Sequence, residues 1–149
     1  AAAFELPKAL SGGGGLFSTA HDYHRFTQML LRRGELDGTR LLGSRTVDYM
    51  TRNHLPGGAD LETLALGSFS EAANAGKGFG LGFSVVDDPV AAKVPSSKGE
   101  FAWGGMASTA FWVDPQEELT VVFMTQLMPS STHPIRSQLH QLVYQALVD

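Results

Sequence analysis

The residue types best suited to chemistry lie close together, in residues 99–126 of this 149-residue chain. Within that stretch, Trp103 is followed directly by Gly104 and Gly105. Glycines inside strand-like sequence weaken strand pairing, and they commonly mark a place where a ligand or another part of the backbone comes close. A tryptophan beside them supplies a large flat wall. The pattern fits an open strand edge whose backbone N–H groups bind a substrate acyl group, and it fits equally a bend of the sheet that the indole packs.

Other patterns that could carry chemistry are weaker. His21 and His24 share one face of an expected helix, but the sequence has no His-Glu-x-x-His, so exposed helix histidines are favoured over a metal site. The glycines at 12–15 are not followed by the Gly-Lys-Ser/Thr of a phosphate-binding loop. Those at 78–82 lie in strand-like sequence rather than at a turn into a helix. We therefore expect neither a metal nor a cofactor.

The sequence contains no complete apparatus for acyl transfer. It has no Gly-x-Ser-x-Gly elbow, no Ser followed three positions later by Lys, and no Tyr followed two positions later by Asn. The number of cysteines is zero, which excludes a cysteine nucleophile, disulfides and thiolate metal sites. The residues alone leave open a binding module without chemistry and a structural remnant without a pocket.

The composition narrows the class of protein. With 11 Lys and Arg against 15 Asp and Glu, the formal net charge is −4, whereas binding to nucleic acid needs a basic face. Hydrophobic residues make up 43% of the chain, and its length suits one globular domain. Because no apolar stretch of about 18 residues occurs, no membrane span is expected. We predict a soluble protein and leave open whether it is cytoplasmic, periplasmic or secreted.

The first residues suggest that the chain is a piece of something longer. It begins with Ala1, Ala2 and Ala3, without an initiator methionine and without a basic or apolar leader segment. A processed mature protein is the competing interpretation.

Local signals near the start predict a helix and a hairpin. Thr19 is a helix N-cap residue type, Asp22 falls in the first turn, and apolar residues at helical spacing follow until Gly34. Asp37 and Gly38 form a pair that is typical of a two-residue hairpin turn.

Two further helices and a long loop are expected. Ser44 is predicted to cap a short helix over residues 45–52. Residues 55–77 show little periodicity and are expected to form a loop. Apolar residues at helical spacing predict an amphipathic helix over 134–148 with Pro134 at its first position.

The second half of the chain has the period of strands. Residues 79–86 alternate between large apolar residues and mostly small ones. Short strands are expected at 101–103 and 109–113, and a buried strand rich in valine at 119–125. This order of elements predicts an α+β fold, in which an antiparallel sheet is flanked by helices.

Four stretches of the chain together resemble the C-terminal part of the serine β-lactamase-like superfamily. They are residues 99–126 and three shorter segments at 13–22, 34–42 and 78–83. The resemblance is greatest to the esterase and transesterase branch, the family VIII carboxylesterases, in which Trp-Gly-Gly stands where β-lactamases and penicillin-binding proteins have Lys-Thr-Gly. It implies the C-terminal part of a β-lactamase/transpeptidase-like fold, with residues 1–149 as a single incomplete domain.

The resemblance also implies roles for the residues around the two glycines. Trp103, Gly104 and Gly105 would form the substrate-binding strand, and the backbone N–H of Met106 would be the second donor of the oxyanion hole. The Ser-x-x-Lys nucleophile and the Tyr base would belong to sequence before Ala1. Because Trp103 replaces a lysine, the cation that would bind a β-lactam carboxylate is missing, which favours neutral esters.

The expected function is therefore that of the C-terminal part of a serine hydrolase, which acts on carboxylic esters through an acyl-enzyme and is inactive by itself. A β-lactamase or D-aminopeptidase-type hydrolase is the alternative within the superfamily, and a non-catalytic ligand-binding module that uses the Gly/Trp strand is the alternative outside it. The expected partners are a small ester or amide substrate in the intact protein, the missing N-terminal part of the domain, and a second copy that pairs with uncovered strand edges.

Overall fold

The computed structural model describes residues 9–14, 16–64 and 74–148, and an antiparallel sheet lies at its centre. The strands of this main sheet are β3 (Lys77–Phe79), β4 (Ser84–Val86), β5 (Phe101–Gly104), β6 (Ala110–Asp114) and β7 (Leu119–Phe123). Their order in space is β3-β4-β5-β6-β7, so each strand pairs with its neighbours in the chain. A separate two-stranded sheet consists of β1 (Glu35–Leu36) and β2 (Thr39–Arg40).

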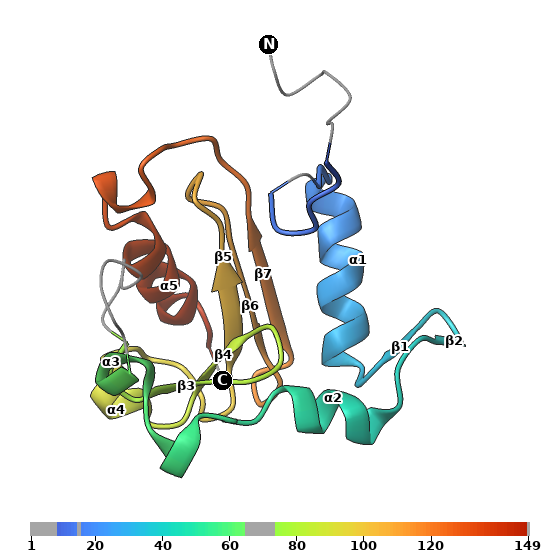
Figure 1. Cartoon of the computed structure of the whole chain (residues 1–149), viewed down its shortest axis with the longest axis horizontal. Coiled ribbons are helices and arrows are strands. Elements are labelled where there is room, and N and C mark those ends of the chain that lie inside the picture. Colours follow the sequence, from blue (N-terminus) through green and yellow to red (C-terminus); the bar gives the residue numbers. More distant parts are fainter. Residues whose placement is uncertain (1–8, 15, 65–73, 149) are drawn as a thin grey trace.

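Helices cover both faces of the main sheet. They are α1 (Ala20–Leu31), α2 (Ser44–Met50), α3 (Leu61–Leu64), α4 (Pro89–Ala92) and α5 (Ile135–Gln145), with 3-10 turns at Pro56–Gly58 and Ser130–Thr132. Figure 1 shows α1 and α5 on opposite sides of the sheet. The predicted fold class, an antiparallel sheet flanked by helices, is therefore confirmed.

The alternation of side chains along β6 explains how the sheet holds a helix on each face. Phe111 and Val113 are buried in the core that α1 covers. Trp112 points the other way, and its ring lies 5.0 Å from the ring of His140 on α5. The rest of the core cluster consists of Met29, Leu30, Val47, Phe83, Val85 and Phe101.

The local signals near the start of the chain are confirmed. The side chain of Thr19 accepts a hydrogen bond from the backbone N–H of Asp22 at 3.1 Å and caps α1. Asp37 and Gly38 have φ of 50° and 77°, which is the left-handed conformation that a type I′ hairpin turn requires at both central positions. The turn joins β1 to β2.

The prediction of strand structure throughout residues 79–86 is wrong in its middle part. The strand β3 ends at Phe79 and β4 begins at Ser84, and the N–H of Gly80 donates to the carbonyl of Phe83 at 2.7 Å, which closes a turn. Gly82 within that turn has a φ of 101°. Large and small residues continue to alternate through this tight turn. The alternation alone therefore does not reveal where the turn interrupts the strand.

Two predicted helix starts are also corrected. The helix expected over 45–52 is α2, but its N-cap is Gly43 without a side-chain hydrogen bond, so Ser44 is the first helical residue rather than the cap. The helix expected over 134–148 is α5, and Pro134 is its N-cap rather than its first position. Helix ends depend on the backbone angles of one or two residues, which residue type only biases.

The strands expected at 101–103, 109–113 and 119–125 are confirmed as β5, β6 and β7, with ends that differ by one or two residues. The loop expected over 55–77 contains a 3-10 turn and α3, and its last residue begins β3. Residues 65–73 of that loop lie outside the described residues.

Candidate functional site

The end of β5 has one open edge. Phe101 and Ala102 pair with β4 on one side and with β6 on the other. Trp103 and Gly104 pair only with β6, opposite Phe111 and Ala110, so within the described part of the chain nothing pairs with their other edge. The open edge that the glycines predicted is therefore present at Trp103 and Gly104.

The indole of Trp103 is accessible. Trp103 and Phe101 lie on the same side of the sheet. Phe101 is buried, whereas Trp103 is 46% exposed. Its ring contacts that of Phe79 edge to face, with centroids 5.0 Å apart. About half of the indole is therefore accessible, and the rest packs against Phe79.

A tight turn follows Gly105. The N–H of Gly105 donates to the carbonyl of Thr109 at 3.0 Å, and the N–H of Ser108 donates to the carbonyl of Gly105 at 3.1 Å. The second bond closes a four-residue β-turn in which Met106 is the second residue. The side chain of Met106 is 72% exposed, and its backbone N–H has no acceptor among the described residues.

The turn is held from two neighbouring segments. Ser108 is buried, and its hydroxyl donates to the carbonyl of Leu127 at 2.7 Å. Arg136, in the first turn of α5, donates from Nη2 to the carbonyls of Gly105 at 2.5 Å and Thr109 at 3.0 Å. Sequence reasoning missed Arg136, because one arginine shortly after a proline is no recognisable signal for a contact about 30 residues away.

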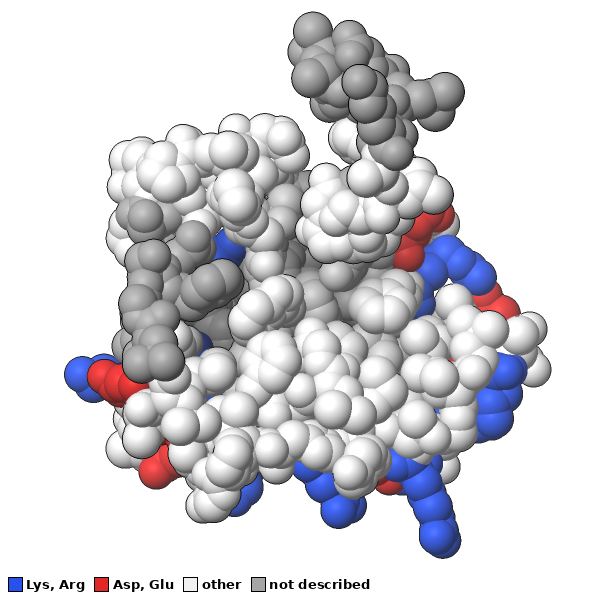
Figure 2. All heavy atoms as spheres, in the orientation of Figure 1, with Lys and Arg blue, Asp and Glu red and all other residues white. Residues whose placement is uncertain are grey.

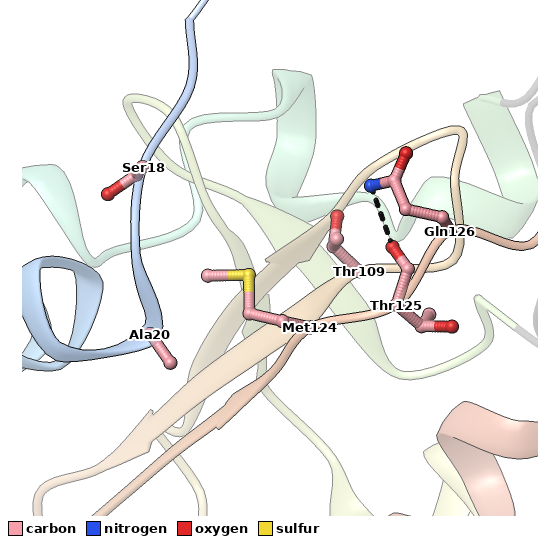
Figure 3. Close-up of a pocket in the computed structure, with 6 residues that line it drawn as sticks. All are labelled: Ser18, Ala20, Thr109, Met124, Thr125 and Gln126. Carbon is pink, nitrogen blue, oxygen red and sulfur yellow. Dashed lines mark hydrogen bonds between the residues drawn. The ribbon is translucent and has the colours of Figure 1, made fainter.

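A cavity of about 330 Å³ lies next to the turn, between the start of α1 and the end of β7. Its lining residues are Ser18, Ala20, Thr109, Met124, Thr125 and Gln126. Figure 3 shows the side chain of Met124 pointing from the sheet toward the segment of Ser18 and Ala20. Trp103 and Met106 are not part of this lining, and Thr109 is the residue that connects the cavity with the turn.

The cavity opens on a face with few charges. In Figure 2 the molecule is hollowed between the start of α1 and the loop that leads to α5, and charged side chains gather mainly at the lower, left and right margins. The lining has hydroxyl groups from Ser18, Thr109 and Thr125, and an amide from Gln126. Such a lining suits an uncharged polar group better than an ion.

A buried polar cluster lies on the opposite face of the sheet, under α5. Glu100 accepts hydrogen bonds from His140 Nε2 at 2.8 Å and from the hydroxyl of Tyr144 at 2.7 Å. The same hydroxyl lies 2.7 Å from Asp114, which is fully buried. Burial, followed by the charge of Glu100, raises the pKa of Tyr144, and burial lowers the pKa of Lys77 nearby. The cluster attaches α5 to the sheet and does not line the cavity.

Residues 9–14, 16–64 and 74–148 contain neither a metal-binding cluster nor a membrane-spanning helix. No three His, Asp or Glu side chains in these ranges come together as ligands for a metal ion. His21 and His24 belong to no such group there. None of the helices in the same ranges has the length and apolar character needed to cross a bilayer.

Comparison with known proteins identifies a family and several relatives of this chain. Residues 1–145 match the sequence model of a family described as Beta-lactamase. Protein Rv1367c of Mycobacterium tuberculosis (strain ATCC 25618 / H37Rv) is 36% identical over 126 residues, which are 83% of this chain and 30% of that protein. Esterase EstB of Burkholderia gladioli is 28% identical over 142 residues, or 95% of this chain and 32% of the esterase.

Solved structures agree with this fold. EstCE1, described as a hydrolase with promiscuous acyltransferase activity, superposes with a TM-score of 0.64 and 27% identity, over 84% of this chain and 29% of EstCE1. Unliganded simvastatin synthase (LovD) from Aspergillus terreus superposes with a TM-score of 0.72 and 24% identity, over 96% of this chain and 37% of the synthase. The second likeness is evidence for the fold alone. The chain spans about a third of the length of the proteins it matches.

Proposed function

Because the chain belongs to the Beta-lactamase family, we propose that it supplies one wall and one oxyanion-hole amide to the ester-cleaving site of a serine hydrolase of the family VIII carboxylesterase branch. The names of two relatives support this direction, since one is an esterase and the other a hydrolase with acyltransferase activity. We further propose that residues 1–149 are the C-terminal part of one catalytic domain, because the chain spans only 30% and 32% of the curated relatives.

The observation that carries the proposal is the unsatisfied N–H of Met106. It lies in the turn that follows the open strand edge, three residues after the exposed Trp103, and it has no acceptor among the described residues. Fixed backbone N–H groups of this kind stabilise the negative charge that develops on the acyl oxygen in the transition state. An amide that is held by its own turn donates without reorganisation at the moment of reaction.

Trp103 and the cavity lining, which has no charged side chain, favour neutral substrates. The nearby guanidinium of Arg136 is engaged with the carbonyls of Gly105 and Thr109. In this proposal the indole packs against the acyl or alcohol part of an ester, because it offers apolar area and no positive charge. A β-lactamase would need a cation near this position for the substrate carboxylate. The nucleophile and the base come from outside these 149 residues, because the sequence has neither Ser-x-x-Lys nor Tyr-x-Asn, and the chain by itself is inactive.

The proposed partner is the remaining part of the same domain. Within the described residues β7 pairs with β6 on one side only, and its five residues are all partly exposed. An unpaired strand edge is a template for a further strand. The rest of the domain would cover this edge and the cavity beside it, and in its absence a second copy would do so. Light scattering of this chain alone should show an oligomer, and a monomer at high concentration would contradict the proposal.

The decisive experiment removes the Met106 N–H without removing the turn. Proline is favoured at the second position of type I and II turns, the φ of Met106 is not positive, and the preceding Gly105 tolerates a following proline. In the complete gene product, Met106→Pro should therefore keep the thermal unfolding midpoint and lower kcat for a nitrophenyl ester by about 10²–10³-fold.

Met106→Ala is the matched control, because it removes the exposed side chain and keeps the N–H. It should turn over the ester at nearly the wild-type rate. The proposal fails if Met106→Pro and Met106→Ala have the same kcat, or if the complete protein hydrolyses a cephalosporin better than the nitrophenyl ester.

The cavity favours a second candidate, a ligand-binding module without chemistry. Its mixed polar and apolar lining and its volume of about 330 Å³ could hold a small molecule without a nucleophile. A fluorophosphonate probe separates the two, since it labels the complete gene product only if a reactive serine is present. Quenching of tryptophan fluorescence by a ligand, without labelling, would favour the binding module.

A further inference from the structure

We propose that Arg136 is a positioning residue, which holds the Gly105–Met106 peptide so that the Met106 N–H faces the open side of the turn. The inference rests on the proposed function of that N–H in the oxyanion hole. The Arg136 side chain lies on α5 and would act on the reacting groups indirectly, through the backbone of the turn that it binds.

The geometry of one peptide unit carries the argument. The carbonyl of Gly105 and the N–H of Met106 belong to the same peptide, which is trans, so the two groups point in opposite directions. The carbonyl is bound on one side of the turn by Arg136 Nη2 at 2.5 Å and by the N–H of Ser108 at 3.1 Å. A rotation of this peptide would break both bonds. Binding the carbonyl therefore fixes the direction of the N–H.

Arg136 also holds the other end of the turn. Its Nη2 lies 3.0 Å from the carbonyl of Thr109, which in addition accepts the N–H of Gly105 at 3.0 Å. The planar guanidinium thus joins two carbonyls that lie on either side of Met106 in the sequence. A hydrogen bond from a cation to the carbonyl of an amide also polarises that amide, which makes its N–H a stronger donor.

The glycine at 104 is explained by this contact. A Cβ at Gly104 would lie 2.7 Å from Cζ and from Nη2 of Arg136, and 2.9 Å from the carbonyl oxygen of Thr109. Any larger residue would have to displace the guanidinium. The first glycine of the Trp-Gly-Gly segment therefore makes room for Arg136, a reason for glycine at this position that is independent of any ligand.

Arg136 is not the only attachment of α5 to the sheet. His140 and Tyr144, farther along the helix, hydrogen-bond to Glu100, and Tyr144 also reaches Asp114. Because these bonds remain, replacing Arg136 should loosen the turn without detaching the helix. A variant of Arg136 can therefore distinguish a role in positioning the turn from a general role in attaching α5.

The test is a double-mutant cycle in the complete gene product. Arg136→Gln should lower kcat for a nitrophenyl ester by about tenfold or more and should change KM little. The loss should not exceed the roughly 10²–10³-fold that loss of an oxyanion donor costs. The affinity for a boronic acid transition-state analogue should fall by the same factor as kcat/KM. In a Met106→Pro background, Arg136→Gln should cost little further activity, because the group that it positions is already gone.

Two further variants serve as controls for this experiment. Arg136→Lys keeps the charge but shortens the side chain and removes the planar guanidinium, so its activity should lie between those of wild type and Arg136→Gln. It keeps the test usable if Arg136→Gln does not fold. Arg45→Gln makes the same change of charge at an exposed arginine and should leave the kinetics unchanged.

The inference is overturned if Arg136→Gln lowers activity by the same factor with Met106 and with proline at 106, or if KM rather than kcat changes. A different result refutes the proposed function itself. If Met106→Pro has full activity, the amide is no oxyanion donor, whatever the effect of Arg136→Gln.

Discussion

The hydroxyl of Tyr144 is the best place to test the energetics of this fold. The hydroxyl lies 2.7 Å from both Glu100 and Asp114, and as a phenol it has one proton, which it donates to one carboxylate at a time. Tyr144→Phe removes only this group, because the ring that stacks on His140 with centroids 4.7 Å apart remains.

The expected loss of stability depends on the hydrogen bonds that the two carboxylates retain in Tyr144→Phe. Asp114 still accepts the N–H groups of Ser97 and Gln116, both at 3.0 Å, and Glu100 still accepts His140 at 2.8 Å. Neither carboxylate is left without a donor, so the loss is that of one hydrogen bond to a charged group, about 2 kcal/mol. For a domain of this size the unfolding midpoint should fall by about 4–8 °C.

Urea unfolding followed by tryptophan fluorescence measures the effect, and a shift of the midpoint at constant slope would indicate a change of stability alone. Tyr49→Phe is the control, since Tyr49 is exposed and its hydroxyl has no hydrogen bond to the described residues. The reasoning is refuted if the two variants have the same stability.

The dependence on pH gives a second readout of the same group. Burial and the neighbouring carboxylates raise the pKa of Tyr144 in the folded protein, whereas in the unfolded chain a tyrosine titrates near about 10. The stability that the group contributes is therefore fully present below about pH 10 and is lost as the pH rises further, because only the unfolded form then releases the proton. The difference between wild type and Tyr144→Phe should narrow above that pH.

Two further substitutions test contacts near the site and at the start of α1. Gly104→Ala should displace Arg136 and cost about 1–3 kcal/mol, with a parallel loss of ester turnover, whereas Gly13→Ala, which meets no atom within 4 Å, should be neutral in thermal unfolding. Thr19→Ala should cost about 1 kcal/mol in urea unfolding because the N–H of Asp22 loses its acceptor, and Thr19→Ser should restore most of it.

Some features of the site were predictable because their causes are local. Trp103 and the glycines after it marked the end of a strand, and the structure has an open edge there. The cavity beside the turn was not predicted as a unit. Its lining comes from the start of α1, the start of β6 and the segment after β7, which are far apart in the chain.

The sequence by itself determined those elements whose signals lie within a few residues. The cap at Thr19, the turn at Asp37 and Gly38, and the short strand expected at 109–113 are local, because each depends on the backbone angles or residue types of neighbouring residues. The order of these elements was enough for the α+β class.

Only the tertiary structure decided which distant side chains meet. Glu100 and His140 are 40 residues apart, Glu100 and Tyr144 are 44 apart, and Arg136 reaches a carbonyl 31 positions earlier in the chain. Such contacts depend on how helix α5 packs across the sheet. Neither residue type nor spacing specifies that packing, because these contacts form only once α5 has docked and no local signal marks which side chains it brings together.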